Sequence, residues 1–159
     1  MAWLPDPLHP AVVHFPIALT FVALLFELLA FFPKLKSLKS ASPLLLVLAA
    51  LSSVAAVLSG EAAEDAAVIP KAARHLLEQH EELGEKVMYA LLVLAALRLI
   101  FFRLERFSAW VRAVFLALLL AVAVAVGYNG KLGGELVFQH GVGTFPSVPP
   151  LPPAADDED

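Results

Sequence analysis

The stretch AVVHFPIALTFVALLFELLAFF, residues 11–32, decides the fold class of this chain. It carries one charged residue, Glu27, over a length that can cross a bilayer, because a hydrocarbon core of about 30 Å needs about 20 helical residues. Similar apolar runs occupy approximately residues 43–59, 87–102 and 109–127. Of the 159 residues, 60% are hydrophobic and only 16% charged, which is too apolar for a soluble domain. We therefore predict an all-α integral membrane protein, a four-helix up-and-down bundle.

The distribution of basic residues predicts how the bundle is oriented. The joints at 33–43 and 103–108 are short, so the helices that they connect should be antiparallel neighbours. The side with these joints carries most of the basic residues: Lys34, Lys36, Lys39, Arg98, Arg103, Arg106 and Arg112. The positive-inside rule makes this side cytoplasmic. We expect a multi-pass protein of the bacterial cytoplasmic membrane with both termini extracytoplasmic (N-out/C-out), and no cleaved signal peptide.

The rest of the composition limits the chemistry that is available. Residues 1–144 form one predicted domain, and residues 145–159, FPSVPPLPPAADDED, form a proline-rich and acidic tail that we expect to be disordered and extracytoplasmic. There is no cysteine, which excludes disulfides, thiolate-bound iron–sulfur clusters and covalent haem attachment through C-x-x-C-H. There is no phosphate-loop motif, and nucleic acid is not an expected partner.

All five histidines fall on the predicted extracytoplasmic side of the bundle: His9, His14, His75, His80 and His140. His9 and His14 are five residues apart, as are His75 and His80, so each pair diverges by about 140° around a helix. A shared site should therefore take histidines from different helices. The alternative is that they are separate polar residues at the membrane interface, and His75 best fits that description.

Proline and glycine shape the same side of the molecule. Pro16 should free a backbone carbonyl or delay the regular helix by a turn, and His14 is then expected to point into the bundle. Gly133 and Gly134 precede His140. This segment should either fold back over the outer end of the bundle and deliver His140 to it, or leave the bundle as a flexible exit.

Two features of the predicted spans have structural explanations. Glu27 lies inside the first span at a depth similar to that of Arg98 in the third, so we expect an ion pair and not a proton pathway. Gly60 with Ala56 gives the second helix a small-x-x-x-small face, which is typical of close helix packing.

Three segments resemble the motifs of domain-of-unknown-function family 2231, a group of small bacterial membrane proteins. They are HPAVVHFPIAL at 9–19, AARHLLEQHEELG at 72–84 and GGELVFQHGVG at 133–143. The positions that match the family pattern are His9, His14, His80, Gly84, Gly133, Gly134 and His140. Related domains are sometimes joined to Rieske or cytochrome c modules, so the resemblance implies redox work on the outer face.

Our first hypothesis is a b-type haem protein with bis-histidine iron, which exchanges electrons at the outer face with quinol or an extracytoplasmic partner. The candidate axial ligands are His14, His80 and His140, with His9 next. Candidate partners for the haem propionates are Arg74, Lys71 and Lys86.

Two other hypotheses stay open. The first is a copper or zinc site for metal sensing or delivery, with His14, His80 and His140 as ligands and Glu135 or Glu81 beside them. The second is a non-catalytic subunit of a larger membrane complex, or a homo-oligomer, whose main partner is the lipid bilayer. The sequence does not decide whether the protein is an enzyme.

Overall fold

The computed structural model describes residues 8–104 and 108–143, with the backbone alone at Pro33, Lys36 and Lys39. This part of the chain is helical and has no strand, which confirms the predicted all-α class. Its elements are α1 (His9–Val12), α2 (His14–Leu29), the 3-10 helix η1 (Pro33–Ser40), α3 (Ser42–Ala66), the 3-10 turn η2 (Lys71–Ala73), α4 (Arg74–Arg103) and α5 (Ala109–His140). The tail predicted to be disordered, 145–159, lies outside the described residues.

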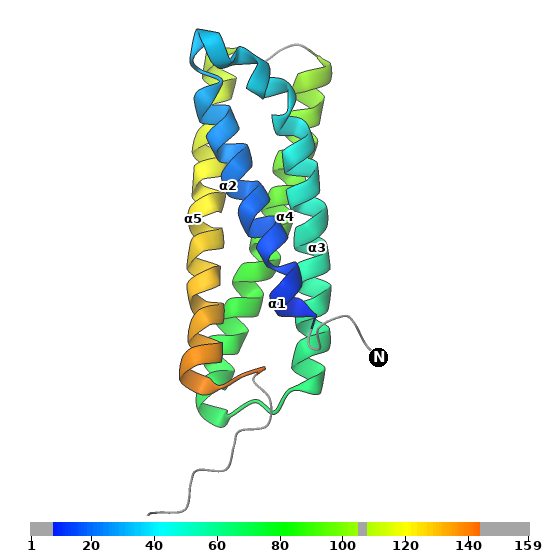
Figure 1. Cartoon of the computed structure of the whole chain (residues 1–159), viewed down its shortest axis with the longest axis vertical. Coiled ribbons are helices and arrows are strands. Elements are labelled where there is room, and N and C mark those ends of the chain that lie inside the picture. The colour runs from blue at the N-terminus through cyan, green and yellow to red at the C-terminus, as the bar shows by residue number, and fades with distance from the viewer. Residues whose placement is uncertain (1–7, 105–107, 144–159) are drawn as a thin grey trace, which may run out of the picture.

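The long helices α2, α3, α4 and α5 lie side by side, and consecutive ones run in opposite directions (Figure 1). Helix α2 packs against α3 and α5, and α4 packs against the same two helices. Within the described chain, the segments long and apolar enough to cross a membrane are His9–Leu29, Ser42–Ala66 and Ala109–His140. The fourth predicted span, residues 87–102, forms the second half of α4.

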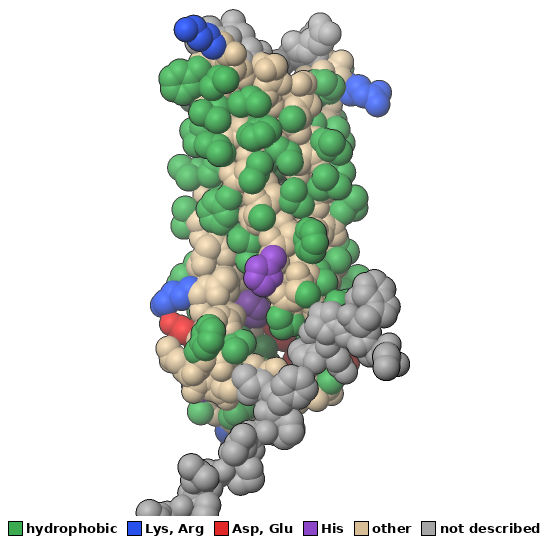
Figure 2. Space-filling model, in the orientation of Figure 1, with side chains coloured by type: hydrophobic (Ala, Val, Ile, Leu, Met, Phe, Trp, Pro, Cys, Tyr) green, Lys and Arg blue, Asp and Glu red, His purple; other side chains and the backbone are tan. Residues whose placement is uncertain are grey.

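The surface of the helices is largely apolar. Figure 2 shows hydrophobic side chains over most of the length of one face, with basic side chains at one end and histidine, acidic and further basic side chains toward the other. Phe21, Leu25 and Leu28 of α2 and Leu118 and Val124 of α5 are among the exposed large hydrophobic residues. Such a surface is expected where lipid, and not water, surrounds the helices.

The first span is broken into two helices near its start. Pro16 has no N–H to donate to the carbonyl of Val12, where α1 ends, and α2 begins at His14. The chain stays close to helical at the break, because the N–H of Val13 bonds to His9 O at 3.1 Å. Of the two alternatives expected at Pro16, the structure supports the loss of the hydrogen bond to a backbone carbonyl, that of Val12; because the chain is helical from His9 onward, it shows no delay of the helix by a turn.

Helix α5 is longer than the apolar run at 109–127. It continues without a break through Gly133 and Gly134 to His140, and it ends at Gly141 with a left-handed φ of 67°. The predictions of a segment that folds back or of a flexible exit were both wrong. A glycine costs a helix only about 1 kcal/mol relative to alanine, and the burial of Leu132 and Leu136 on either side of the pair offsets that cost.

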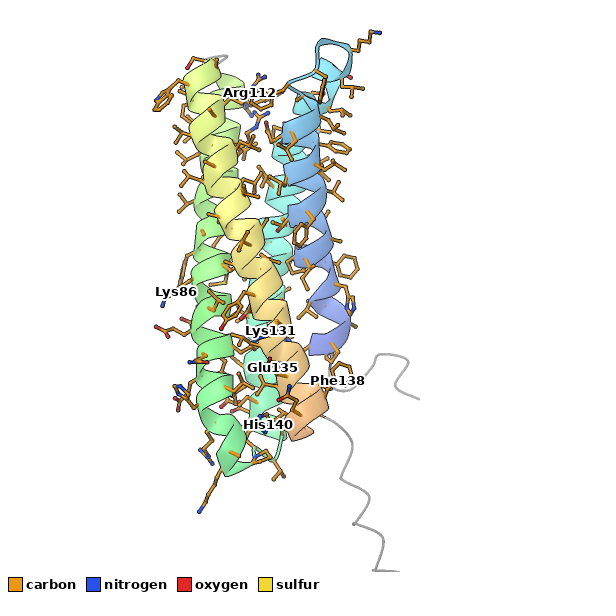
Figure 3. The ribbon with its side chains drawn as sticks, turned by 90° about the vertical axis from the view of Figure 1, so that its left-hand side faces the viewer. Lys86, Arg112, Lys131, Glu135, Phe138 and His140 are labelled. Atoms are coloured by element: carbon orange, nitrogen blue, oxygen red, sulfur yellow. The ribbon has the colours of Figure 1, made fainter. Side chains whose placement is uncertain are left out.

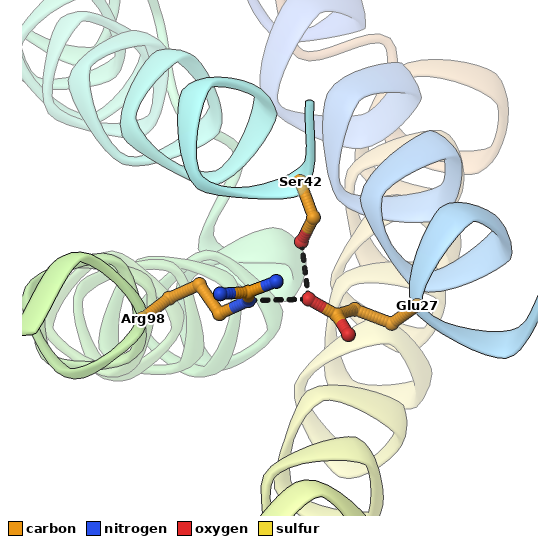
Figure 4. A network of polar contacts seen from close by, with 3 residues as sticks. All are labelled: Glu27, Ser42 and Arg98. Atoms are coloured by element: carbon orange, nitrogen blue, oxygen red, sulfur yellow. Dashed lines mark hydrogen bonds and ion pairs between the residues drawn. The ribbon is translucent and has the colours of Figure 1, made fainter. Parts of the chain in front are cut away.

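The predicted ion pair between Glu27 and Arg98 is confirmed. Arg98 Nε donates to Glu27 Oε1 at 2.5 Å, and both side chains are about 98% buried or more. The hydroxyl of Ser42, the first residue of α3, donates to the same carboxylate oxygen at 2.5 Å (Figure 4). This cluster joins α2, α3 and α4 at the end of the molecule opposite the histidines.

Candidate cofactor site

His9, the first residue of α1, is held against α3 through one ring nitrogen. Its Nδ1 lies 2.9 Å from the carbonyl oxygen of Ala56 and 3.1 Å from Ser59 Oγ. The Ser59 hydroxyl itself donates to the Ala56 carbonyl at 2.9 Å. Because a carbonyl oxygen only accepts, Nδ1 of His9 carries the proton, and Nε2 of the neutral ring keeps its lone pair.

His80, in the first half of α4, is fixed in the same way against α5. Its Nδ1 donates to the carbonyl oxygen of Asn129 at 3.1 Å. Burial lowers the pKa of His80 below its ordinary value of 6.5; the hydrogen bond to Asn129 acts against this shift, and the charge of His9 adds to it. The ring is therefore neutral at pH 7, with its proton on Nδ1 and its lone pair on Nε2.

The two rings lie next to each other because their helices share the neighbour α3. Helix α1 packs against α2 and α3, whereas α4 packs against α3 and α5. The ring centroids of His9 and His80 are 6.4 Å apart, and the ring planes are at 88°. A histidine that ligates a metal commonly donates its other ring N–H to a backbone carbonyl or a carboxylate, which fixes its tautomer and orientation. Both rings have this arrangement.

A glycine lies under each ring. A Cβ atom on Gly60 would lie 3.2 Å from Cε1 of His9, and one on Gly133 would lie 3.1 Å from Cε1 of His80. Both distances are tighter than ordinary van der Waals contact, so any larger residue would push the ring away from its position. The two glycines allow each imidazole to lie directly on the neighbouring helix.

A comparison with protein families identifies the family of this chain. A model described as "Predicted membrane protein (DUF2231)" matches residues 5–146. The chain belongs to this family. No curated protein and no solved structure matches it. The match confirms the expected family, and the matched part of the DUF2231 chain contains both His9 and His80 with the residues that hold them.

The structure of this DUF2231 protein does not bring all the predicted ligands together. His14 is exposed on α2, so the expectation that it points into the bundle was wrong. The reason is the divergence of about 140° between residues five apart: once His9 faces α3, His14 faces outward. His140 is half-buried near the end of α5, one turn beyond Glu135, which pairs with Lys131 at 3.1 Å (Figure 3).

The remaining candidates lie apart from the two rings. His75 is exposed and contacts Gln79 of its own helix, with 3.2 Å between the side-chain nitrogens. Arg74 is exposed at the start of α4, six residues before His80 and about 120° around the helix from it. Within residues 8–104 and 108–143, no three histidine or acidic side chains are arranged to hold a metal ion. The structure therefore shows no assembled site of His14, His80 and His140 in that part of the chain.

An acidic cluster lies where α3 ends and α4 begins, and it includes Glu81, the residue that follows His80 in the chain. Glu81 is half-buried, and loss of hydration raises its pKa to about 7, with further contributions from a hydrogen bond to Glu64 and from the charges of Glu64, Glu61 and Glu78. A carboxyl group with this pKa is partly protonated at neutral pH. Its protonation reduces the negative charge of the cluster.

The sequence interpretation assigned Ala56 and Gly60 to helix packing alone, and it missed Ser59 and Asn129, so none of the residues that hold the rings was predicted for the site. A repeated spacing could have indicated them. In both helices the carbonyl that binds a histidine precedes a glycine by four residues, as Ala56 precedes Gly60 and Asn129 precedes Gly133. Asn129 is also a polar residue directly after the long apolar run of α5, which is a second signal.

Proposed function

We propose that this chain is a b-type haem protein of the bacterial cytoplasmic membrane, with His9 and His80 as the axial ligands of one haem. The observation that carries the proposal is the pairing of two neutral rings whose Nδ1 atoms are both occupied by backbone carbonyls. Only Nε2 of each ring then remains to bind iron. Bound between the rings, haem would supply a one-electron couple.

The positions of the two rings support a group that both histidines hold. Their centroids are 6.4 Å apart, and the Nδ1 of each ring is occupied by a backbone carbonyl. His9 and His80 would therefore each offer Nε2 to the group, and neutral imidazole nitrogen is a donor that haem iron accepts.

The number of converging histidines favours haem over a bare metal ion. Zinc in proteins takes three or four protein ligands, whereas haem iron takes four nitrogens from its own macrocycle and needs two from the protein. His9 and His80 converge, and no third histidine or acidic ligand joins them in the described chain. A copper or zinc site is the second hypothesis, and a non-catalytic subunit is the third. An absorption spectrum distinguishes both from a haem protein.

The proposed topology places the site at the outer surface. We infer that residues 87–102 of α4 cross the membrane with the other spans, that the basic ends at Lys34–Lys39 and Arg98–Arg112 are cytoplasmic, and that both termini are extracytoplasmic. His80 then lies seven residues, about 10 Å, outside the apolar part of α4. A site in one leaflet does not carry electrons across the membrane. It exchanges them with quinol or with an extracytoplasmic protein, and the acidic cluster around Glu81 favours a basic one.

An absorption spectrum of the detergent-purified protein, oxidised and reduced, tests the proposal. We expect a Soret band and, on reduction, the sharp α-band of six-coordinate low-spin b haem. His80→Ala should lose the haem or turn it high-spin, because it removes one iron ligand. His75→Ala is the matched control on the same helix and should leave the spectrum unchanged.

Two results would contradict the haem assignment. A colourless preparation from cells well supplied with haem, with copper or zinc found by elemental analysis, would replace haem by a metal ion. A colourless preparation without bound metal would leave the non-catalytic subunit as the remaining hypothesis. A coloured protein whose spectrum survives both His9→Ala and His80→Ala would show that the haem is held elsewhere.

A further inference from the structure

A groove with a volume of about 520 Å³ runs along the outer surface between α4 and α5. Its wall on α4 includes Leu83, Val87, Ala90, Leu94 and Leu97. These positions repeat at intervals of four and three residues, so they form one stripe along the helix. His80 is the next position of the same stripe, three residues before Leu83. The α4 wall of the groove therefore leads directly to His80.

The opposite wall, on α5, leads to the same place. It includes Leu118, Val122 and Ala125, again at intervals of four and three. The next position of this stripe is Asn129, whose carbonyl oxygen accepts the hydrogen bond from His80. Extended outward by one turn, the two walls meet at the hydrogen bond between His80 and Asn129.

Asn129 lies one turn beyond the residues of α5 that line the groove, and it carries the first polar side chain of this stripe. Its Oδ1 atom is buried and has no hydrogen-bond partner within the described chain. Its Nδ2 atom lies 3.3 Å from where a Cβ on Gly84 would be, so the amide lies against α4 one turn from His80. A buried acceptor without a partner costs about 1–3 kcal/mol. A turn of the amide toward the groove would expose Oδ1 to a ligand hydroxyl, whose hydrogen bond would remove that cost.

The charge at the groove indicates a neutral ligand. Lys86 is the only basic residue that lines it, and Lys86 Nζ pairs with Glu82 at 2.8 Å. The remaining lining is apolar apart from the hydroxyl of Tyr89. A phospholipid with an anionic head group would gain little from a lysine that is already neutralised. A neutral molecule with a long apolar tail fits this lining better.

We propose that the groove between α4 and α5 binds a long-chain quinol, with its tail along the apolar stripes and its ring at Asn129 beside His80. The redox part of this inference rests on the proposed haem function. Oxidation of one quinol to the quinone releases two electrons and two protons. An acceptor held by His9 and His80 would take these electrons one at a time and would be reoxidised by its partner between them, and both protons leave to water.

Photolabelling tests the binding site without reference to haem. The probe is an azidoquinone with a ten-carbon tail, added to the purified full-length protein and mapped by mass spectrometry. We expect labelled peptides from residues 83–97 and 118–129, and competition by an unlabelled quinone with the same tail. Ala121→Phe fills the groove from α5 and should reduce labelling at least tenfold. Ala117→Phe, one turn away on the same exposed side but outside the groove, is the control and should label normally.

The electron-transfer step has its own readout. In protein that contains haem, a short-chain quinol should reduce the haem at least tenfold more slowly in Ala121→Phe than in Ala117→Phe, and Asn129→Ala should slow it as well. Labelling outside the groove, or competition by phosphatidylglycerol but not by quinone, would overturn the inference. A colourless protein that is labelled in the groove would remove the haem function while leaving the quinone site in place.

Discussion

Gly60 and Gly133 occupy equivalent positions on two different helices. Each follows by four residues the carbonyl that accepts a histidine Nδ1–H, and each lies under the ring of that histidine. The carbonyl fixes the direction of the ring, and the absent side chain lets the ring come down to the helix surface. A carbonyl followed four residues later by a glycine therefore positions His9 on α3, and the same arrangement positions His80 on α5.

The first prediction concerns Gly133→Ala. The new Cβ would lie 3.1 Å from Cε1 of His80, so the ring must move and its hydrogen bond to Asn129 should weaken. We expect the helix to form normally and the cofactor to be lost or to become high-spin, as measured by the reduced spectrum. Gly134→Ala is the neighbouring control, because a Cβ there meets nothing within 4 Å. It should keep the spectrum and raise stability by about 0.5–1 kcal/mol. Equal spectra for the two variants would refute this role of Gly133.

The second prediction concerns the buried ion pair. Glu27→Gln removes the negative charge that faces Arg98 and should lower the free energy of unfolding by about 3–5 kcal/mol. Thermal unfolding in detergent measures this loss. The double variant Glu27→Leu with Arg98→Leu should recover much of it, since no charge is then left in the interior. The cofactor should stay bound in both folded variants. Loss of cofactor at unchanged stability would instead make Glu27 part of the site.

Much of the fold follows from patterns that are local in the sequence. Apolar runs predicted the helices, Pro16 predicted the missing hydrogen bond to a carbonyl near the start of the first span, and a shared depth in the membrane predicted the pair of Glu27 with Arg98. Local rules failed at Gly133 and Gly134. Their intrinsic preference indicated a loop, but the burial of neighbouring leucines keeps the helix intact to His140.

The sequence predicted a site of histidines from different helices, but it did not predict which histidines form it. Divergence of residues five apart correctly required histidines from different helices, and it required that His9 and His14 face different ways. It could not say which of the two faces inward. That choice depends on the rotation of α1 against α3, which the hydrogen bond from His9 to Ala56 reports and no sequence pattern specifies.

The third prediction is a dependence of stability on pH that arises from Glu81. Burial and its acidic neighbours raise the pKa of Glu81 from 4.5 to about 7, so the folded state binds this proton more tightly than the unfolded state. Stability should therefore fall as the pH rises from about 4.5 to about 7 and stay lower above it. Glu81→Gln should flatten this part of the profile and raise the melting temperature at pH 8. Glu85→Gln, at an exposed position of the same helix, is the control. A wild-type profile in Glu81→Gln would contradict the assignment.

The fourth prediction is the orientation in the membrane. The chain has no cysteine, so single cysteines report their own location. In intact cells, an impermeant thiol reagent should label Ala67→Cys, between α3 and α4, and should not label Ser37→Cys, between α2 and α3. Disruption of the cells should make both accessible. The reverse pattern in intact cells would invert the topology and place the histidine pair on the cytoplasmic side.

The last prediction separates His9 from His14, the two histidines of the first motif. His9 holds two hydrogen bonds to α3 and lies 6.4 Å from His80, whereas His14 is exposed on α2. His9→Ala should therefore remove or convert the cofactor, and His14→Ala should change the spectrum little, which is the opposite of the order expected from the sequence alone.

Ser59→Ala is an intermediate case. It keeps the Ala56 carbonyl but removes the hydroxyl that shares the Nδ1 proton, so we expect a small shift in redox potential with the haem retained. If His14→Ala abolished the spectrum while His9→Ala preserved it, the axial pair would have to be reassigned from His9 to His14, and the ring geometry described here would not be that of the loaded protein.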